Sequence, residues 1–335
     1  MTITKRSLLA AAAGLAALPR AARAQGQPPG ERFPSRPIRV IVPYAPGGAT
    51  DIVARLLGEE MRRQLGQPLV VENRPGAAGI IAIEAMARSR PDGHTVMIGN
   101  VTTNAITPVL FRQRMPLDYA KEVVAVGRLA DLPAFVLATA TNFAPRTLEE
   151  FVAYARANPG KVNYCSAGVG SYPQFDAVLF ARRAGIEMVH VPMPGGAGPI
   201  ITEMLSGNIQ FCMLNVATAA GHVRDGRIRA LAAISDARLP EFPDIPTLAE
   251  AGYPGIGTIA WQGMFAPAAT PREALEALHR AATEALRAEP VLDAFRRQGI
   301  RAVPNASVDD ARAWFEGELA NWRRIVEEAK IEVNN

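Results

Sequence analysis

Two adjacent glycines, Gly47 and Gly48, stand where a short apolar strand meets a helix near the start of the chain. The run 38–42 is β-branched and bounded by prolines, which is typical of a strand buried on both faces. The apolar spacing that follows predicts a helix capped at Thr50 or Asp51. Unpaired amides at such a helix start can bind a carboxylate or a phosphate. We therefore predict an anion site here, with the alternative that the glycines only turn the chain, as in any α/β protein.

Small and polar residues also gather in loops that follow other predicted strands. Ligands of open α/β sheets bind beyond the carboxyl ends of the strands, so these loops would share one site if two sheets faced a cleft. The loops carry no Lys or Arg, so backbone amides, hydroxyls and ordered water would hold a carboxylate. The candidate ligand-binding residues are Tyr44, Pro46, Gly47, Gly48, Thr50, Thr102, Thr103, Asn104, Ser166, Gly168, Gly170, Ser171, Gly195, Gly196, Asn215 and Trp261.

Three residues near these loops have a structural alternative. Trp261 would either line the cleft or pack where the chain crosses between domains, and the packing role is slightly favoured. His190 ends a predicted strand, where a structural histidine is expected more often than a functional one. Asp51 is expected to cap its helix, because a carboxylate beside an anion would oppose binding.

Catalytic and cofactor motifs are lacking. The run from Gly168 to Pro173 starts like a dinucleotide fingerprint, but proline replaces its third glycine. The chain contains neither a P-loop nor the Gly-x-Ser-x-Gly motif, and the predicted ligand loops hold neither His nor Cys. The four histidines, which have no metal-ligand spacing, are His94, His190, His222 and His279. We expect no catalytic residues, no metal and no cofactor, with an α/β enzyme as the remote alternative.

The first 24 residues read as an export signal. Lys5-Arg6 precedes an apolar run over 8–18, and small residues over 22–24 favour cleavage near Ala24. The expected location is the periplasm, and a leader over 25–32 precedes the fold. The export route, Sec or twin-arginine, stays open.

The mature charge and the cysteines narrow the partners further. Removal of the signal takes four of the 36 basic residues and no acidic one, which leaves 32 basic against 32 acidic residues. A neutral chain without a basic run argues against nucleic acid as a partner. Cys165 and Cys212 lie in apolar, strand-like runs, so buried free thiols are favoured over a disulfide, although export would permit one.

Strands and helices alternate along the mature chain, which predicts an α/β protein with two doubly wound domains around a cleft. The first series has strands over 38–42, 69–72 and 95–99 and helices over 50–65 and 79–88. The second series has strands over 132–138, 162–165, 188–191, 209–214 and 228–234 and helices over 148–157, 172–184 and 199–205.

The last third of the chain is expected to return to the first domain. A Pro/Gly-rich stretch over 240–257 leads to a crossing strand over 258–265. Helices follow over 272–288, 291–298 and 308–329, the last capped by Ser307. The predicted division is residues 33–128 plus 256–335 for domain 1 and 129–255 for an inserted domain 2, which would provide a hinge.

Several motifs in this order resemble the solute receptors of the tripartite tricarboxylate transporter system, called the Bug or TctC family. They are the glycine turn after 38–42, Val70-Val-Glu-Asn-Arg-Pro-Gly76, Pro91-Asp-Gly-His-Thr95, His190-Val-Pro192, Pro243-Asp-Ile-Pro-Thr-Leu-Ala-Glu-Ala-Gly252 and Phe265-Ala-Pro-Ala-Ala-Thr-Pro271. The resemblance covers nearly the whole mature chain. It implies a type II periplasmic-binding-protein (Venus flytrap) fold, with the glycine turn and the 166–171 loop gripping a carboxyl group from opposite sides.

The resemblance further implies a small organic carboxylate as ligand, membrane transporter subunits as partners and a monomer in solution. Many relatives have Phe-Asp-Asn where this chain has Met213-Leu214-Asn215, so a recognised ligand ammonium is less expected; equally, Leu214 would simply point into the core. Which carboxylate binds stays open. A periplasmic sensor that feeds a signalling receptor is the alternative to a transport role.

Overall fold

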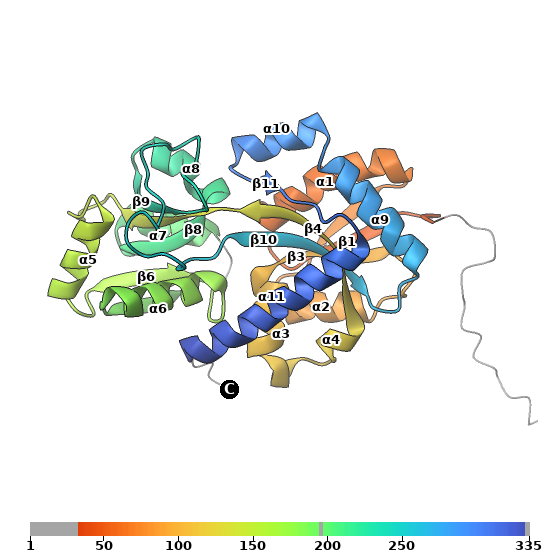
Figure 1. The fold of residues 1–335 in the computed structure, drawn as a ribbon, viewed down its shortest axis with the longest axis horizontal. Helices are drawn as coiled ribbons and strands as arrows, with labels where there is room; N and C mark the ends of the chain where they lie inside the picture. The colour runs from red at the N-terminus through yellow and green to blue at the C-terminus, as the bar shows by residue number, and fades with distance from the viewer. Residues whose placement is uncertain (1–32, 194–196, 332–335) are drawn as a thin grey trace, which may run out of the picture. The chain divides into compact units, whose positions relative to one another are not determined.

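Two β-sheets organise the residues that this computed structural model describes, 33–193 and 197–331 (Figure 1). The six-stranded sheet has the order β11-β4-β10-β3-β1-β2, and the five-stranded sheet has the order β7-β6-β8-β5-β9. The first sheet comprises β1 (Ile38–Val42), β2 (Leu69–Asn73), β3 (Thr95–Asn100), β4 (Val123–Leu132), β10 (Ala260–Pro267) and β11 (Arg301–Ala302). The second comprises β5 (Ala134–Thr139), β6 (Val162–Ser166), β7 (Met188–Pro192), β8 (Phe211–Asn215) and β9 (Ile228–Ile234).

Helices accompany both sheets, as two doubly wound domains require. Those of the first domain are α1 (Ala49–Leu65), α2 (Ile80–Ala87), α3 (Thr107–Leu110), α4 (Tyr119–Glu122), α9 (Arg272–Ala285), α10 (Glu289–Arg297) and α11 (Val308–Ala329). Those of the second domain are α5 (Leu148–Ala157), α6 (Tyr172–Ala184), α7 (Ala197–Ser206) and α8 (Val216–Arg224). Short helical turns also occur over Ala77–Gly79, Val101–Ile106, which is π-helical, and Arg112–Arg114. The α/β class with two domains is thus confirmed.

The sheets are mixed rather than wholly parallel. β1 pairs in parallel with β2 and β3, whereas β10 runs antiparallel to β3 and β4. The predicted strand over 132–138 is wrong in its bounds: β4 ends at Leu132, β5 begins at Ala134, and Pro133 separates them because proline cannot donate to a strand ladder. The prediction missed most of β4, and it missed α8 entirely. The exact bounds of the two domains stay a prediction.

β5 shows why its sequence is apolar throughout. Phe135 and Leu137 pack in one hydrophobic cluster, and Val136 and Ala138 pack in another. Because alternate side chains of a strand point to opposite faces, these two clusters lie on the two sides of the second sheet. A strand covered on both faces has no polar alternation, as expected of a doubly wound sheet.

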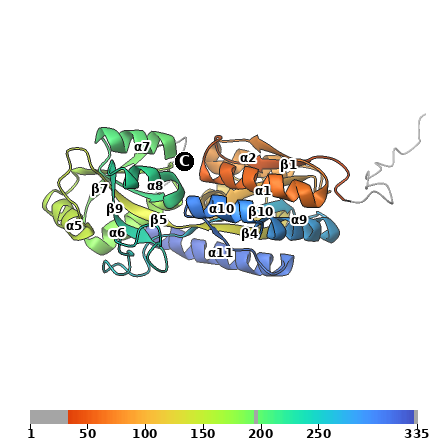
Figure 2. The ribbon, with the colours of Figure 1, turned by 90° about the horizontal axis from the view of Figure 1, so that it is seen from above.

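The closing helix α11 joins elements of both domains. The prediction placed it against the first domain, and it does contact β4, but it also contacts α6, and its course can be followed in Figure 2. Arg182 of α6 donates hydrogen bonds to the carbonyls of Glu328 (2.9 Å) and Ala329 (2.8 Å). The ring of Phe175 meets that of Trp322 edge-on, with centroids 5.7 Å apart. The predicted cap is confirmed, since the Ser307 side chain accepts a bond from the third residue of the helix.

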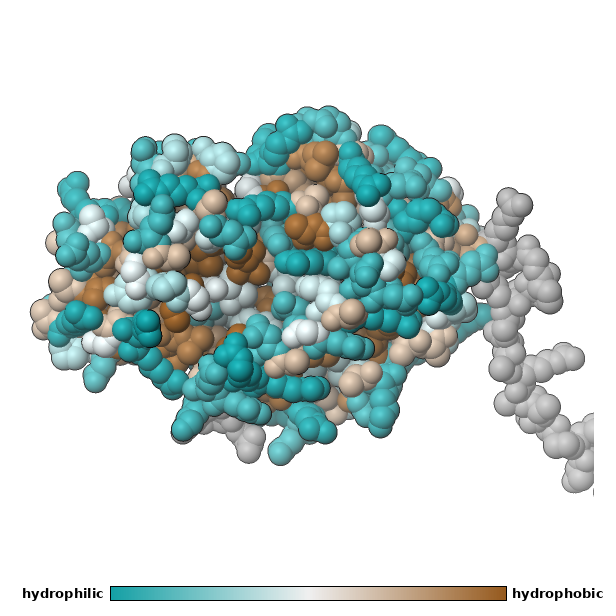
Figure 3. All heavy atoms as spheres, in the orientation of Figure 1, coloured by the Kyte–Doolittle hydropathy of each residue, from teal (hydrophilic) through white to brown (hydrophobic). Residues whose placement is uncertain are grey.

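Polar side chains cover most of the face seen in Figure 3, with small apolar areas between them. Large apolar side chains that are exposed in the described chain belong to separate elements: Val70, Ile81, Tyr154, Val169 and Val189. Across residues 33–193 and 197–331, no helix is both long enough and apolar enough to cross a membrane.

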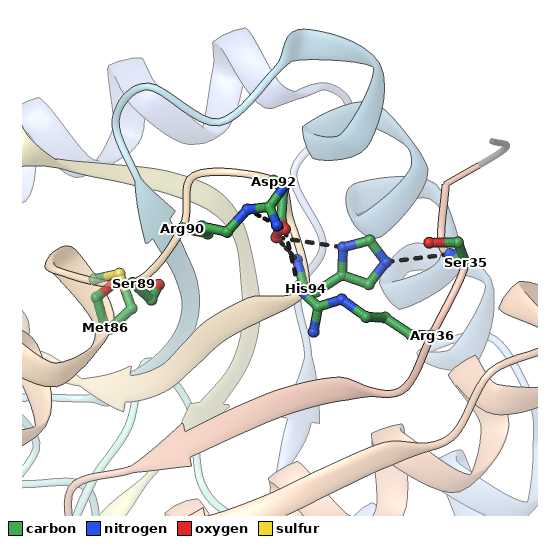
Figure 4. A network of polar contacts seen from close by, with 7 residues as sticks. All are labelled: Ser35, Arg36, Met86, Ser89, Arg90, Asp92 and His94. Carbon is green, nitrogen blue, oxygen red and sulfur yellow. Dashed lines mark hydrogen bonds and ion pairs between the residues drawn. The ribbon is translucent and has the colours of Figure 1, made fainter. Parts of the chain in front are cut away.

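The Asp92–His94 turn fastens the first described residues to the sheet (Figure 4). The buried imidazole of His94 accepts a bond from the Ser35 amide at 3.1 Å, and the Phe33 ring meets it edge-on. Asp92 forms an ion pair with Arg36 at 2.9 Å. This turn precedes β3, whereas the predicted ligand loops follow the strands. We therefore assign the motif over 91–95 a role in folding and not in ligand binding.

We expect His94→Ala to lower the free energy of unfolding by about 1 to 3 kcal/mol, because the Ser35 amide loses its acceptor and Phe33 loses its aromatic neighbour. Chemical denaturation at pH 7.5 measures this. Ser35→Ala is the matched control, because the bond uses the Ser35 backbone and survives the substitution. Equal stability of His94→Ala and wild type would contradict the fastening role.

Candidate functional site

The β1–α1 turn begins its helix earlier than predicted. The N-cap is Gly48 rather than Thr50 or Asp51, and no side chain bonds at that position. Asp51 is the third helical residue, and its carboxylate accepts a bond from the Gly47 amide at 2.9 Å. Gly47 has a φ of +86°, which only glycine adopts readily. The first helical bond runs from the Ile52 amide to Gly48, so the amides of 49–51 precede the helical ladder and have no partner within it.

The negative charge of the Asp51 carboxylate is balanced within the turn by Arg55. Arg55 donates to it at 3.0 Å, and the Asn73 side chain donates at 2.9 Å. Burial acts to raise the pKa of Asp51, but these bonds, with the one from the Gly47 amide, outweigh it and lower the pKa below its usual value. The charge that would repel an anion is therefore compensated by Arg55.

A left-handed turn follows β2, and it was not predicted from the sequence. All four residues of 76–79 have positive φ, including Ala77 (+47°) and Ala78 (+54°). Such values are strained for alanine and tend to occur at functional sites. Thr107 donates its hydroxyl to the Ala78 carbonyl at 2.8 Å, and residues 76–78 are exposed. The only sequence signal was the pair of glycines that flank the two alanines.

Thr103 and Asn104 lie inside the first domain. Their exposed fractions are 1% and 0%, and the Asn104 amide donates to the Tyr119 hydroxyl at 2.9 Å. Thr103 forms a capping box with Asn100, whose side chain also accepts a bond from the Tyr44 hydroxyl at 2.8 Å. Burial raises the pKa of Tyr44. Thr103 and Asn104 were predicted to bind ligand; in the structure both are buried and bonded to neighbouring side chains.

The π-helical turn over Val101–Ile106 meets the end of the 166–171 loop of the second domain. The Thr102 hydroxyl accepts a bond from the Tyr172 amide at 3.3 Å. A Cβ atom on Gly170 would lie 2.6 Å from the side chain of Leu110, so the Gly170 backbone packs directly against that side chain. The structure thus brings together predicted site residues from both domains, Thr102 and the 168–171 stretch.

Both serine hydroxyls of the 166–171 loop are already engaged. Ser166 donates to the Gly168 carbonyl at 3.0 Å, and Ser171 donates to the same carbonyl at 2.7 Å. Both serines are buried, whereas Ala167 and Val169 are exposed. A ligand at this loop would consequently meet backbone groups and the Val169 side chain before it met a hydroxyl.

A hydrogen-bond network fixes which atoms donate around His190; we call Ser166, Gly170, Gln174 and His190 the His190 network. The Gly170 amide donates to Gln174 Oε1 at 2.7 Å, which assigns the oxygen of that side chain. Gln174 Nε2 then faces His190 Nδ1 at 3.3 Å, so Nδ1 is the acceptor. His190 Nε2 carries the proton and donates to Ser166 Oγ at 2.8 Å.

This polarity is the reverse of a nucleophilic serine–histidine pair. A catalytic base must accept the serine proton, whereas Nε2 of His190 already holds one. Burial lowers the pKa of His190, which favours the neutral imidazole. His190 was predicted to be structural, and in the structure its two ring nitrogens bond to Ser166 and Gln174.

The other predicted residues mostly cap helices or lie in the core. Asn215 caps α8 and accepts bonds from Thr218, and Leu214 is buried in the core, which favours the core alternative for Leu214. Trp261 is 2% exposed and donates to Glu318 at 2.7 Å, so it packs in the core instead of lining a surface. Thr50 is also buried. Gly195 and Gly196 lie outside the described residues.

The two cysteines are free and buried, as predicted. Cys165 and Cys212 are register partners on the parallel strands β6 and β8. The contact with Cys165, together with burial, raises the pKa of the Cys212 thiol. Within the described chain, no three His, Cys, Asp or Glu side chains are grouped as a metal ion would need.

A surface hollow of about 350 Å³ lies beside α6 and away from these loops. Tyr164, Ile186 and Met188 are among the residues that line it, and its guanidinium, from Arg182, already bonds to α11. Glu187 also lines the hollow, and its carboxylate would oppose an anion, so we place the candidate site at the loops.

Asp176 is a buried carboxyl one turn into α6. It accepts bonds from the Thr258 amide at 2.9 Å and the Thr258 hydroxyl at 2.7 Å, and is 2% exposed. Burial raises its pKa to about 7, although the bonds from Thr258 act in the opposite direction. The helix that begins in the ligand loop is thus tied to the segment that leads into β10.

Comparisons with known proteins point to one family. The family described as "Tripartite tricarboxylate transporter family receptor" (TctC) matches residues 53–331. BugT of Bordetella pertussis is 34% identical over 298 residues, which cover 89% of this chain and 90% of that protein.

Two solved structures from Rhodopseudomonas palustris contain carboxylates. MatC with bound malate is 32% identical, with a TM-score of 0.79, and the match covers 88% of this chain and 100% of that one. A second protein, with adipate, is 29% identical, with a TM-score of 0.83, and the match covers 89% and 99% of the two chains.

The raised pKa of Asp176 predicts the pH dependence of folding. Between about pH 4 and 7 the folded protein keeps a proton that the unfolded chain has released, so stability falls as the pH rises through this range. Asp176→Asn removes the titration, and its amide retains partners at Thr258. We expect its free energy of unfolding, relative to wild type, to rise with pH by up to about 1.4 kcal/mol per unit.

Denaturant unfolding curves at pH 5, 6, 7 and 8 measure this difference in the free energy of unfolding. Asp244→Asn, on an exposed residue, is the control and should follow the wild type. Parallel curves for Asp176→Asn and wild type would show that Asp176 does not titrate in this range.

Proposed function

The chain belongs to the tripartite tricarboxylate transporter receptor family, and on that premise we propose that it captures a small carboxylate in the periplasm for an uptake system of this kind. The observation that carries the proposal is a set of backbone loops at the carboxyl ends of the strands. The loops 45–48, 76–79 and 166–169 are exposed in part, contain no Lys or Arg, and are held by positive-φ residues. Fixed amides of this kind suit one carboxyl group.

The ligand class follows from the relatives. Similar receptors hold malate and adipate, which are both dicarboxylates. The described loops provide no fixed cation, so we propose that the first carboxyl group is held by amides and ordered water. The exposed Val169 supplies an apolar contact for a carbon chain.

A binding role without catalysis is part of the proposal. It is supported by the His190 network, in which His190 donates to Ser166 and so cannot take its proton. We further propose export with cleavage near Ala24 and a monomer in solution.

Thermal unfolding of residues 25–335 with a ligand library tests the function. The library contains mono-, di- and tricarboxylates, aromatic acids, amino acids, sugars and nucleotides. A ligand at about 100 times its dissociation constant adds roughly 2.7 kcal/mol, which raises the melting temperature. We expect a dicarboxylate to do so. Stabilisation by a sugar or a nucleotide alone would refute the carboxylate proposal.

Gly48→Val tests the place of binding. A Cβ atom at Gly48 would meet only the Ala45 carbonyl, at 3.8 Å, and φ is negative, so the fold should be kept. The valine side chain would stand where a ligand approaches the amides of 49–51. We expect at least a tenfold loss of affinity by calorimetry, about 1.4 kcal/mol.

Gly317→Val, at an exposed position on α11 with open space around it, is the matched control and should bind normally. Wild-type affinity in Gly48→Val would move the site away from this turn.

A further inference from the structure

We propose that His190 is a positioning residue for the ligand loop 166–171, and that protonation of its imidazole loosens the loop and weakens carboxylate binding. The inference rests on the proposed function, since it concerns the regulation of that same site. His190 lies on β7, and its side chain bonds to Ser166 and Gln174.

The His190 network ties three elements together through side chains. Ser166 ends β6, Gln174 lies in the first turn of α6, and His190 lies on β7. Without the imidazole, the Ser166 hydroxyl loses its donor at 2.8 Å and the Gln174 amide loses its acceptor at 3.3 Å. The first loss falls at the start of the loop, and the second falls at Gln174, which holds the Gly170 amide near the end of the loop.

No counter-ion is in contact with the imidazole in the described chain. Tyr164 of β6 stacks on it, with centroids 4.9 Å apart, and Ser166 and Gln174 bond to it. Burial raises the pKa of Tyr164 to about 12, so this neighbour is uncharged at neutral pH. Burial also lowers the pKa of His190. The surroundings of this half-buried ring therefore favour the neutral imidazole and place no acidic side chain against the protonated form.

Protonation would set two donors against each other. A protonated Nδ1 points its hydrogen at Gln174 Nε2, which is itself a donor. Turning the Gln174 amide relieves this contact but brings Nε2 to the Gly170 amide, which then loses its acceptor. Gly170 is buried and has a φ of +82°, with Leu110 against it. Either arrangement leaves a buried donor unpaired in the loop, which is costly.

A bound carboxylate would attract a protonated imidazole, so simple electrostatics predicts the opposite trend. If attraction dominated, affinity would increase on acidification. If loosening of the loop dominates, affinity decreases. The sign of the pH dependence therefore separates the two effects.

The network can be read without ligand. In protein over residues 25–335 at pH 7.5, the imidazole ¹⁵N resonances should show His190 protonated at Nε2 and not at Nδ1. Hydrogen exchange at the Gly170 amide should be about tenfold faster in His190→Leu, which packs on Tyr164 but cannot bond, and close to wild type in His190→Gln, which restores a donor. An Nδ1-protonated tautomer, or unchanged exchange in His190→Leu, would overturn the proposal.

Binding supplies the second readout. Calorimetry with L-malate and with adipate from pH 8 to pH 5.5 should show wild-type affinity falling by about tenfold, and His190→Gln should show a flatter profile. His279→Gln is the matched control: burial also lowers the pKa of His279, but this residue bonds to Asn305. It should keep the wild-type profile. Tighter wild-type binding at pH 5.5 would refute the proposal. Failure of every carboxylate in the library to bind at any pH would instead refute the proposed function, and the ligand-free measurements would then decide on the network alone.

Discussion

An anion held by backbone amides requires that the backbone itself be held, and most of the structure around the candidate site meets this constraint. The 76–79 turn keeps two alanines at positive φ, secured by Thr107. The β1–α1 turn is closed by Asp51, whose charge Arg55 offsets. Buried side chains such as Thr103 and Asn104 bond to neighbours and not to solvent. The polar residues near the site thus mainly fix the geometry of amides.

Helix α6 connects this surface to the rest of the molecule. It begins in the ligand loop, where its first amide bonds to Thr102 of the other domain. One turn later Asp176 is tied to Thr258, and at the far end Arg182 bonds to the last carbonyls of α11. Helix α6 therefore joins the loop to the segment entering β10 and to α11. Both of these connect the two domains. Changes in the His190 network act on the same helix, through Gln174.

Local patterns predicted most elements well. The bounds of α5, α6 and α11 follow from apolar periodicity and from caps such as Thr147 and Ser307, which depend only on neighbours in sequence. β4 was missed because Arg128 and Asp131 interrupt its apolar run; in the structure they pair with each other at the sheet. The glycine turn was recognised, but its N-cap was misplaced by two or three residues, because the Asp51 side chain bonds back to the Gly47 amide from the third helical position.

By itself, the sequence determined the α/β class, the order of most elements, the glycine turn and the family motifs, because strand and helix periods and turn residues are local properties. Only the tertiary structure decided which polar residues reach the surface. Trp261 and Asn104 were predicted to bind ligand. Each instead donates a hydrogen bond to a residue of another element, Glu318 and Tyr119 respectively. His190 meets Ser166 because β6 and β7 pair in register. Such side-chain contacts depend on packing between segments distant in sequence, so local patterns do not predict them.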